Sequence, residues 1–211
     1  MDLVSGPLRL LFVGRLVQEK GILTLIAAAG KLGCPVHLRV LGVGPLEKLL
    51  ATQASRYPDL ILSAEGFATA NQVSQAMVWS HAVVVTSEPH SYWSEQWGRV
   101  AVEAMLSGRP TVVSDSGELP NIVLEPDPIF PAGDVAALTS ILCKLEGNPY
   151  SMMDLGARLR TSADRFSPRK LALEINAFWD LVHSDSLRNC WAESRLQKCS
   201  SSHRVLSRGV C

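Results

Sequence analysis

Short apolar runs alternate with helical segments along most of this chain, and this alternation limits the fold more than any other feature. Each run is rich in Val, Leu and Ile and has the length of a buried strand. The runs are 8–13, 36–41, 60–63, 81–86, 111–114 and 129–130. The helical segments are 22–31, 46–56, 71–80, one opening at Arg99, 135–145, 151–162 and 169–182. Such strands with helical crossovers form a parallel sheet covered on both faces. We therefore expect an α/β fold with a doubly wound, Rossmann-like parallel sheet.

Polar residues follow three of these strands. Arg15, Glu95 and Ser116 each lie past the end of a predicted strand. In doubly wound sheets, ligands bind beyond the carboxyl ends of the strands, where the strand order reverses. We therefore expect these three residues to converge on one crevice.

The segment 94–105 predicts what that crevice binds. Glu95 and Glu103 are separated by seven residues, with Gly98 in a loop and Arg99 opening a helix between them. A helix N-terminus has unpaired N–H groups and a partial positive charge, so it can hold phosphate. The carboxylates would repel phosphate, but they can accept hydrogen bonds from hydroxyls on either side of it. A ligand with a sugar, a diphosphate and a second sugar fits this arrangement, and a nucleotide-sugar is one.

Three ordered motifs resemble those of the retaining group-1 glycosyltransferases, which have the GT-B architecture. The segment 94–105 resembles the family's Glu-x7-Glu motif, and Phe-Val-Gly-Arg-Leu-Val-Gln-Glu-Lys-Gly at 12–21 resembles its Gly-Arg…Lys-Gly loop. The segment 103–117 resembles its Glu-Ala-Met-x-x-Gly-x-Pro-Val-Val run and Gly-rich loop. The resemblance covers residues 8 to 182 and implies the C-terminal, donor-binding half of a GT-B fold.

The resemblance also implies which residues are catalytic. Arg15 and Lys20 would bind the diphosphate and stabilise the charge that grows on the departing nucleoside diphosphate. Glu95 would face the donor sugar. Relatives generally need no metal at the diphosphate, so we expect no metal or other cofactor, with Arg15 and Lys20 in its place.

Further residues are implied to bind the donor. Glu103 would contact the ribose, and backbone N–H groups at Ser116 and Gly117 would approach the sugar. Phe67 and Ala68 occupy the position where relatives hold the base. The whole expected donor-binding set is Gly14, Phe67, Ala68, Gly98, Arg99, Val100, Glu103, Ser116 and Gly117.

Each of these charged residues also has a simpler interpretation. Arg15 and Lys20, taken alone, read as surface charges on a loop, and Glu95 lies in a polar loop where a solvated carboxylate is ordinary. Glu103 has mostly apolar neighbours, so we expect it to be buried. A buried carboxylate is costly without a partner, and ribose hydroxyls would supply one.

Composition excludes several classes of function. The net charge is zero, so no electrostatic attraction favours binding to nucleic acid. The sequence shows no signal peptide or transmembrane stretch, and its five cysteines fit reduced thiols, so we expect a cytoplasmic protein. A peripheral contact with a membrane is left open. His37, His81 and His90 are not spaced in the sequence as the ligands of a metal ion usually are, so they predict no metal site.

We expect residues 1–182 to form one domain and 183–211 a disordered tail without apolar periodicity. The first strand begins at Leu8, which leaves no room for an acceptor domain before it. The predicted partners are therefore the nucleotide-sugar donor and a separate acceptor-binding chain or domain. Two alternatives stay open: a non-catalytic nucleotide-sugar-binding module or donor subunit of a two-chain enzyme, and a fragment of a sugar-nucleotide epimerase.

Overall fold

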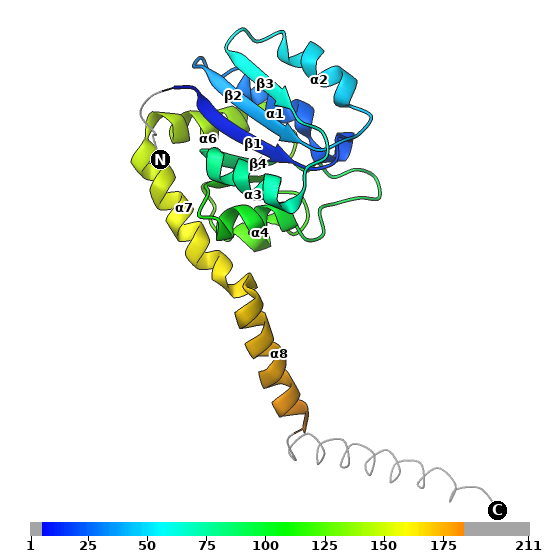
Figure 1. Cartoon of the computed structure of the whole chain (residues 1–211), viewed down its shortest axis with the longest axis vertical. Coiled ribbons are helices and arrows are strands. Elements are labelled where there is room, and N and C mark those ends of the chain that lie inside the picture. The colour runs from blue at the N-terminus through cyan, green and yellow to red at the C-terminus, as the bar shows by residue number, and fades with distance from the viewer. Residues whose placement is uncertain (1–5, 184–211) are drawn as a thin grey trace, which may run out of the picture. The chain divides into compact units, whose positions relative to one another are not determined.

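Six parallel strands form a sheet with the order β3-β2-β1-β4-β5-β6. Figure 1 labels β1 to β4 of this sheet. The computed structural model describes residues 6–183. The strands are β1 (Leu8–Val13), β2 (Val36–Leu41), β3 (Leu60–Ala64), β4 (Ala82–Val85), β5 (Thr111–Ser114) and β6 (Ile129–Phe130). Every strand coincides with a predicted apolar run to within one residue at either end. The predicted α/β fold with a Rossmann-like parallel sheet is confirmed.

The strand order reverses between β1 and β4. The chain runs outward from β1 through β2 to β3, and then returns to place β4 on the other side of β1. The helices that follow β1 and β4 therefore depart in different directions and leave a crevice at the carboxyl ends of these two strands. This is the place where the sequence predicts a ligand.

Helices connect and cover the strands. They are α1 (Ile22–Ala29), α2 (Glu47–Ala54), α3 (Ala70–Trp79), α4 (Arg99–Leu106), α5 (Leu119–Val123), α6 (Val135–Gly147) and α7 (Pro149–Ala163). α1 packs against α2 and α6, whereas α3 contacts β1, and α4 contacts β4, β5 and α7. Buried side chains of α3 (Ala76, Met77) and α4 (Ala104) share one apolar cluster with Leu11 and Val83 of the sheet. This cluster holds α4 against the strands, with its N-terminus at the crevice.

Two short helical elements between β1 and α6 were not predicted. A 3-10 turn, η1 (Gln18–Lys20), follows β1, and α5 follows the Gly-rich loop after β5. α5 has a proline in its first turn, where the missing N–H costs nothing, and it buries Leu119 and Ile122. Tertiary burial, rather than the helix propensity of these five residues, explains why this helix forms.

The described chain divides into two compact units, one ending at Asp164 and one beginning at Arg165. A 3-10 turn, η2 (Asp164–Phe166), precedes α8 (Pro168–His183), which belongs to the second unit although the sequence assigned it to the first domain. α8 exposes the apolar side chains Leu171, Leu173, Ile175 and Trp179. The predicted tail lies outside the described residues except for His183, so its disorder stays a prediction. No helix within residues 6–183 is long and apolar enough to cross a membrane.

Candidate active site

A cavity of about 140 Å³ lies at the carboxyl ends of β1 and β4. Its lining residues are Phe12, Val13, Gly14, Lys20, Val85, Thr86, Ser87, Glu95, Gly98, Arg99 and Val100. The loop after β1 and the segment around Glu95 therefore meet in one crevice, as the sequence predicts. Arg15 and Ser116, which were also expected there, do not line this cavity.

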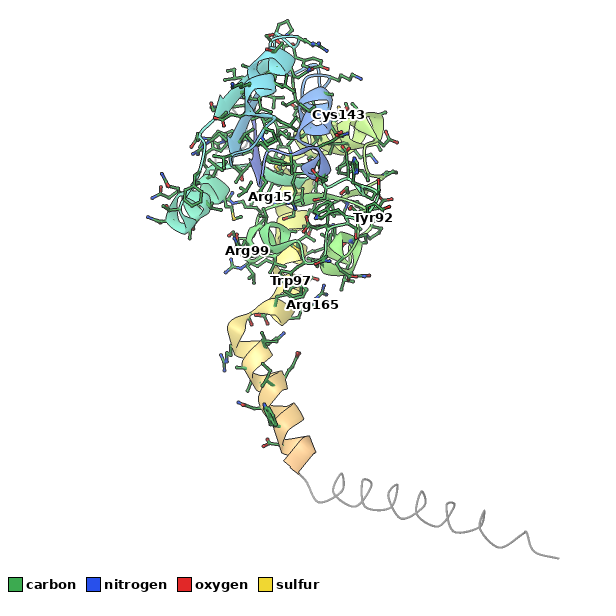
Figure 2. The ribbon with its side chains drawn as sticks, turned by 90° about the vertical axis from the view of Figure 1, so that its right-hand side faces the viewer. Arg15, Tyr92, Trp97, Arg99, Cys143 and Arg165 are labelled. Carbon is green, nitrogen blue, oxygen red and sulfur yellow. The ribbon has the colours of Figure 1, made fainter. Side chains whose placement is uncertain are left out.

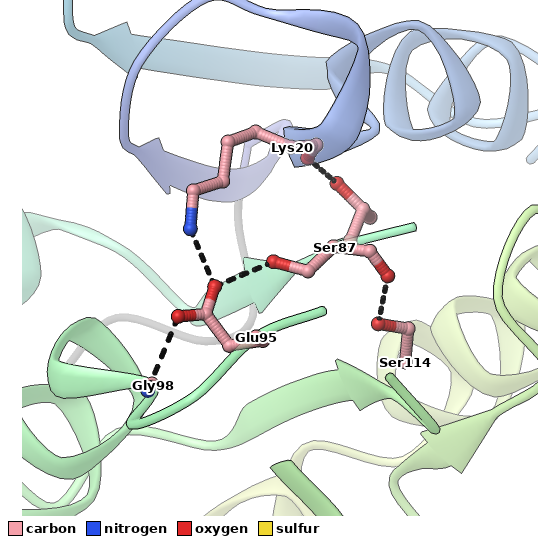
Figure 3. A network of polar contacts seen from close by, with 6 residues as sticks. Lys20, Ser87, Glu95, Gly98 and Ser114 are labelled. Carbon is pink, nitrogen blue, oxygen red and sulfur yellow. Dashed lines mark hydrogen bonds and ion pairs between the residues drawn. The ribbon is translucent and has the colours of Figure 1, made fainter. Parts of the chain in front are cut away.

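Lys20 and Glu95, which both line the cavity, form an ion pair (Figure 3). The two residues are 75 positions apart in the sequence, and their side chains are only 21% and 13% exposed. The Ser87 hydroxyl donates to Glu95 Oε2 at 2.8 Å, and the Gly98 amide lies 3.4 Å from Oε1. Glu95 is therefore a fixed and largely buried carboxylate, which rules out the interpretation of it as a solvated loop residue.

The environment of Glu95 changes its acidity. Burial alone raises the pKa of this carboxyl, but the bonds from Lys20 and Ser87 lower it, and the net pKa is below the ordinary value. A carboxyl whose folded pKa is lowered adds stability above its unfolded pKa. That stability is lost as the pH falls through the folded pKa.

Removing the cation should reverse this shift. We expect Lys20→Met to raise the pKa of Glu95, because the effect of burial is then opposed only by weaker hydrogen bonds. A pH titration of the glutamate carboxyl carbons by NMR measures the change. Lys48→Met removes an exposed lysine and is the matched control. An unchanged Glu95 pKa in Lys20→Met would show that the ion pair does not exist in solution.

Main-chain and hydroxyl contacts hold Lys20 in place. Thr86 Oγ1 donates to the Lys20 carbonyl at 2.8 Å, and Ser114 Oγ donates to the Ser87 carbonyl at 2.5 Å (Figure 3). The ring of Trp93 lies 4.8 Å from the Lys20 ammonium, within reach of a cation–π interaction. Sequence reasoning missed Thr86, Ser87 and Ser114. Their position at the carboxyl ends of β4 and β5 was the available signal.

The N-terminus of α4 opens onto the cavity. Gly98 has φ of 54°, and a Cβ there would lie 2.6 Å from Leu119 Cδ2, so this position favours glycine. The amides of Arg99 and Val100 have no hydrogen-bond partner among the described residues. Such free amides, together with the helix dipole, favour an anion at this point.

Two predicted charged residues, Arg15 and Glu103, lie outside the cavity lining, whereas Arg99 belongs to it. Arg15 is exposed in the loop after β1, and Arg99 is exposed at the start of α4 (Figure 2). Glu103 was expected to be buried, and this is wrong: its side chain is 42% exposed and its Oε1 lies 3.2 Å from Arg99 Nε. Arg99 is four residues earlier on the same helix face, so Glu103 has a local partner at the surface. The burial argument for a ribose contact therefore fails, and the contact rests on the resemblance alone.

The loop after β5 supports Glu95 through the main chain. The Glu118 amide donates to the Glu95 carbonyl at 2.9 Å, and Gly117 packs so closely that a Cβ would lie 2.0 Å from that carbonyl. Ser116 is buried, and its hydroxyl has no hydrogen-bond partner among the described residues. Gly117 therefore packs against the main chain of Glu95, and neither Ser116 nor Gly117 lines the cavity.

Phe67 and Ala68 lie in the loop after β3 and do not line the cavity. Phe67 is 79% exposed, and Ala68 packs against the apolar cluster of α3 and α4. Their expected contact with a base stays a prediction. Within residues 6–183, no three His, Cys, Asp or Glu side chains gather as metal ligands would. That leaves the expected absence of a metal requirement untested.

A family of known proteins matches most of this chain in sequence. Residues 7–148 match a family model described as "Glycosyl transferases group 1". The chain belongs to the group 1 glycosyltransferases. The family predicted from the sequence motifs is confirmed.

Curated relatives of this glycosyltransferase domain agree with the family. The chain is 32% identical over 147 residues to the glycogen synthase of Mycobacterium tuberculosis (strain CDC 1551 / Oshkosh). The match covers 65% of this chain and 34% of the relative. The chain thus spans about one third of the length of the curated relatives it matches.

Solved structures share the fold. The catalytic domain of cholesterol-α-glucosyltransferase from Helicobacter pylori superposes with a TM-score of 0.69 at 20% identity, covering 77% of this chain and 100% of that chain. Anabaena HepE, solved with UDP and glucose, gives 0.70 at 23% identity, covering 82% and 48%. Sucrose-phosphate synthase from Thermosynechococcus elongatus gives 0.68 at 23% identity, covering 83% and 45%. The predicted likeness to half of a GT-B enzyme is confirmed at the level of fold.

Proposed function

We propose that this glycosyltransferase domain binds a nucleotide-diphosphate-sugar in the cavity between β1 and β4 and transfers the sugar with retention of anomeric configuration. One observation carries the proposal: the free amides of Arg99 and Val100 open onto the same cavity as the Lys20–Glu95 pair. The amides and the ammonium supply donors for phosphate oxygens. The carboxylate supplies an acceptor for sugar hydroxyls.

The Lys20–Glu95 pair is compatible with phosphate binding. An ammonium has three N–H donors, so Lys20 can contact Glu95 and still donate to a phosphate oxygen. Glu95 likewise has acceptor capacity beyond its bonds to Lys20 and Ser87. Binding would therefore extend the existing network rather than break it.

Lys20 and Arg15 would then assist departure of the nucleoside diphosphate. As the glycosidic bond breaks, negative charge grows on the leaving diphosphate oxygen. Fixed cations and amides aimed at that oxygen stabilise the charge more than they stabilise the ground state. Lys20 is already immobilised by Glu95 and Thr86, so it needs little reorganisation. Arg15 would fold inward from its exposed position to reach the diphosphate.

The similar structures support the choice of donor class. HepE was solved with UDP, with UDP and glucose, and with UDP-glucose. We propose a donor of this kind for the present chain, together with an acceptor held by a separate domain or chain. A cytoplasmic location is proposed with it, since nucleotide-sugars are made inside cells.

Calorimetry against a panel of nucleotide-sugars tests the binding. We expect one nucleoside diphosphate-sugar to bind, and the free nucleoside to bind far more weakly. Release of nucleoside diphosphate in the presence of sugar and lipid acceptors then separates a transferase from a non-catalytic binding module. Failure of the whole panel to bind would refute the proposal.

Glu95 and Glu103 should affect different parts of the donor. We expect Glu95→Gln to weaken UDP-glucose binding, relative to UDP binding, by roughly tenfold, because a charged acceptor for the sugar hydroxyls is lost. Glu103→Gln should weaken both ligands equally, since its proposed contact is the ribose. Calorimetric Kd values for the two ligands give the ratio for each variant. An unchanged ratio in Glu95→Gln would contradict the sugar contact.

A further inference from the structure

A second cavity lies at the opposite edge of the sheet from the donor site. It has a volume of about 310 Å³, more than twice that of the cavity between β1 and β4. Its lining residues are Ser107, Gly108, Arg109, Pro110, Met152, Met153, Ala157 and Arg160. Four of them form the turn between α4 and the amino end of β5, and four belong to α7. The two cavities share no lining residue.

Close main-chain packing shapes this second cavity. A Cβ on Gly156 of α7 would lie 2.6 Å from the Gly108 carbonyl oxygen and 3.1 Å from Pro110 Cδ. α7 therefore rests directly on the turn after α4, without an intervening side chain. Because backbone contacts fix both walls, the cavity is formed before any ligand arrives.

The polar side of the cavity is cationic. Arg109 and Arg160 line it, and no Asp or Glu is among its lining residues. Arg109 is partly buried and donates from Nη1 to the Ser80 carbonyl at 3.2 Å. Burial and the nearby Arg9 lower the pKa of Arg109. Arg160 is exposed, and its guanidinium has no ion pair among the described residues.

The remaining walls are apolar and adaptable. Met152 and Pro110 are buried, and Met153 is 55% exposed. Methionine side chains are flexible and polarizable, so they adjust to the shape of a bound group. A cavity of this size with apolar walls and a few convergent polar groups is typical of small-molecule sites.

We propose that this second cavity binds a small organic anion, in which a phosphate or carboxylate group contacts Arg109 and Arg160 and an apolar body packs on the methionines. The site is separate from the donor cavity, so the inference does not rest on the proposed function. One helix nevertheless joins the two places. The first residues of α4 line the donor cavity, and the turn that follows its last residue lines the second one. A ligand that fixes this turn would act on the helix whose amides face the donor.

Phenyl phosphate is a suitable probe, with inorganic phosphate and phenol as its separate halves. We expect calorimetry to detect phenyl phosphate at millimolar concentration or below, and each half to bind at least about tenfold more weakly. Arg160→Gln should weaken phenyl phosphate by about tenfold or more, because a charge-assisted bond is lost. Ala157→Leu should also weaken it by filling the cavity. Arg56→Gln, which removes an exposed arginine elsewhere, should have no effect.

The outcomes are distinct. Loss of phenyl phosphate binding in Lys20→Ala, with binding retained in Arg160→Gln, would place the anion in the donor cavity and overturn the inference. Equal affinity for phenyl phosphate and inorganic phosphate would show that the apolar body of the ligand does not pack on the methionines, which contradicts that part of the inference. Absence of binding to the unmodified chain would refute the site altogether. Melting temperatures of Arg160→Gln and Ala157→Leu are measured in parallel, so that a folding defect in one variant leaves the other to decide.

Discussion

Lys20→Ala is expected to weaken nucleoside-diphosphate binding by roughly ten- to a hundredfold, because a charge-assisted bond to phosphate contributes about 1.5–3 kcal/mol. The loss of affinity for the nucleoside diphosphate should lie near the hundredfold limit of this range. Without Lys20, the largely buried carboxylate of Glu95 lacks its counter-ion and repels the incoming phosphate. The free nucleoside, which has no phosphate, should bind as before. Calorimetry with a nucleoside diphosphate and its nucleoside measures both effects.

A double variant separates these two causes. If Lys20 contacts phosphate, Lys20→Ala/Glu95→Gln should recover only the part of the affinity that repulsion removed. If the double variant binds as tightly as the unmodified chain, Lys20 serves only to neutralise Glu95, and the phosphate contact is refuted.

Arg15→Ala should weaken binding of the nucleoside diphosphate by roughly ten- to a hundredfold and leave binding of the nucleoside unaffected. Lys48→Ala, at an exposed site, is the control for lost charge.

Gly117→Ala is expected to destabilise the fold by roughly 3 kcal/mol and to abolish recognition of the donor sugar. Gly117 has φ of 57°, and a Cβ would lie 2.0 Å from the Glu95 carbonyl oxygen. The main chain at Glu95 would have to move to admit the methyl group, and the carboxylate would move with it. Denaturant unfolding measures the stability, and calorimetry with UDP and UDP-glucose measures the recognition.

Gly33→Ala is the matched control for this experiment. Gly33 has φ of 70°, but a Cβ there would meet nothing within 4 Å. Its replacement should cost only the roughly 1–2 kcal/mol of a left-handed conformation, without any effect on ligands. Equal losses of stability in the two variants would show that the contact between Gly117 and Glu95 contributes nothing.

The parts of the fold governed by local pattern were predictable from the sequence. The strands were predicted correctly because continuous runs of Val, Leu and Ile with the length of a strand usually form buried strands in a globular domain. α5 was missed because Leu119–Val123 is short and contains a proline, so only its burial against α4 and α7 makes it helical. No division after Asp164 was predicted, since helical periodicity does not indicate what a helix packs against, and the predicted domain bounds stay a prediction.

The site was predictable only in part. Because strand ends of a parallel sheet meet at one edge, Arg15, Glu95 and Ser116 were expected in one crevice. Of these three only Glu95 lines the cavity, together with Lys20 and Gly98 from the same motifs. The direct ion pair between Lys20 and Glu95 depends on side chains 75 positions apart, and no local pattern encodes it. Glu103 was misplaced because apolar neighbours along the sequence need not share its face of the helix.

The loop that carries Glu95 is attached through main-chain atoms at both of its ends. The Glu88 amide bonds to the Glu19 carbonyl at one end, and the Glu95 carbonyl accepts from Glu118 at the other. Between them, the side chain of Tyr92 is fully exposed. Substitution at the tip leaves both attachments intact, so the residues there can vary, in evolution or in a designed library, while the Glu95 carboxylate keeps its position.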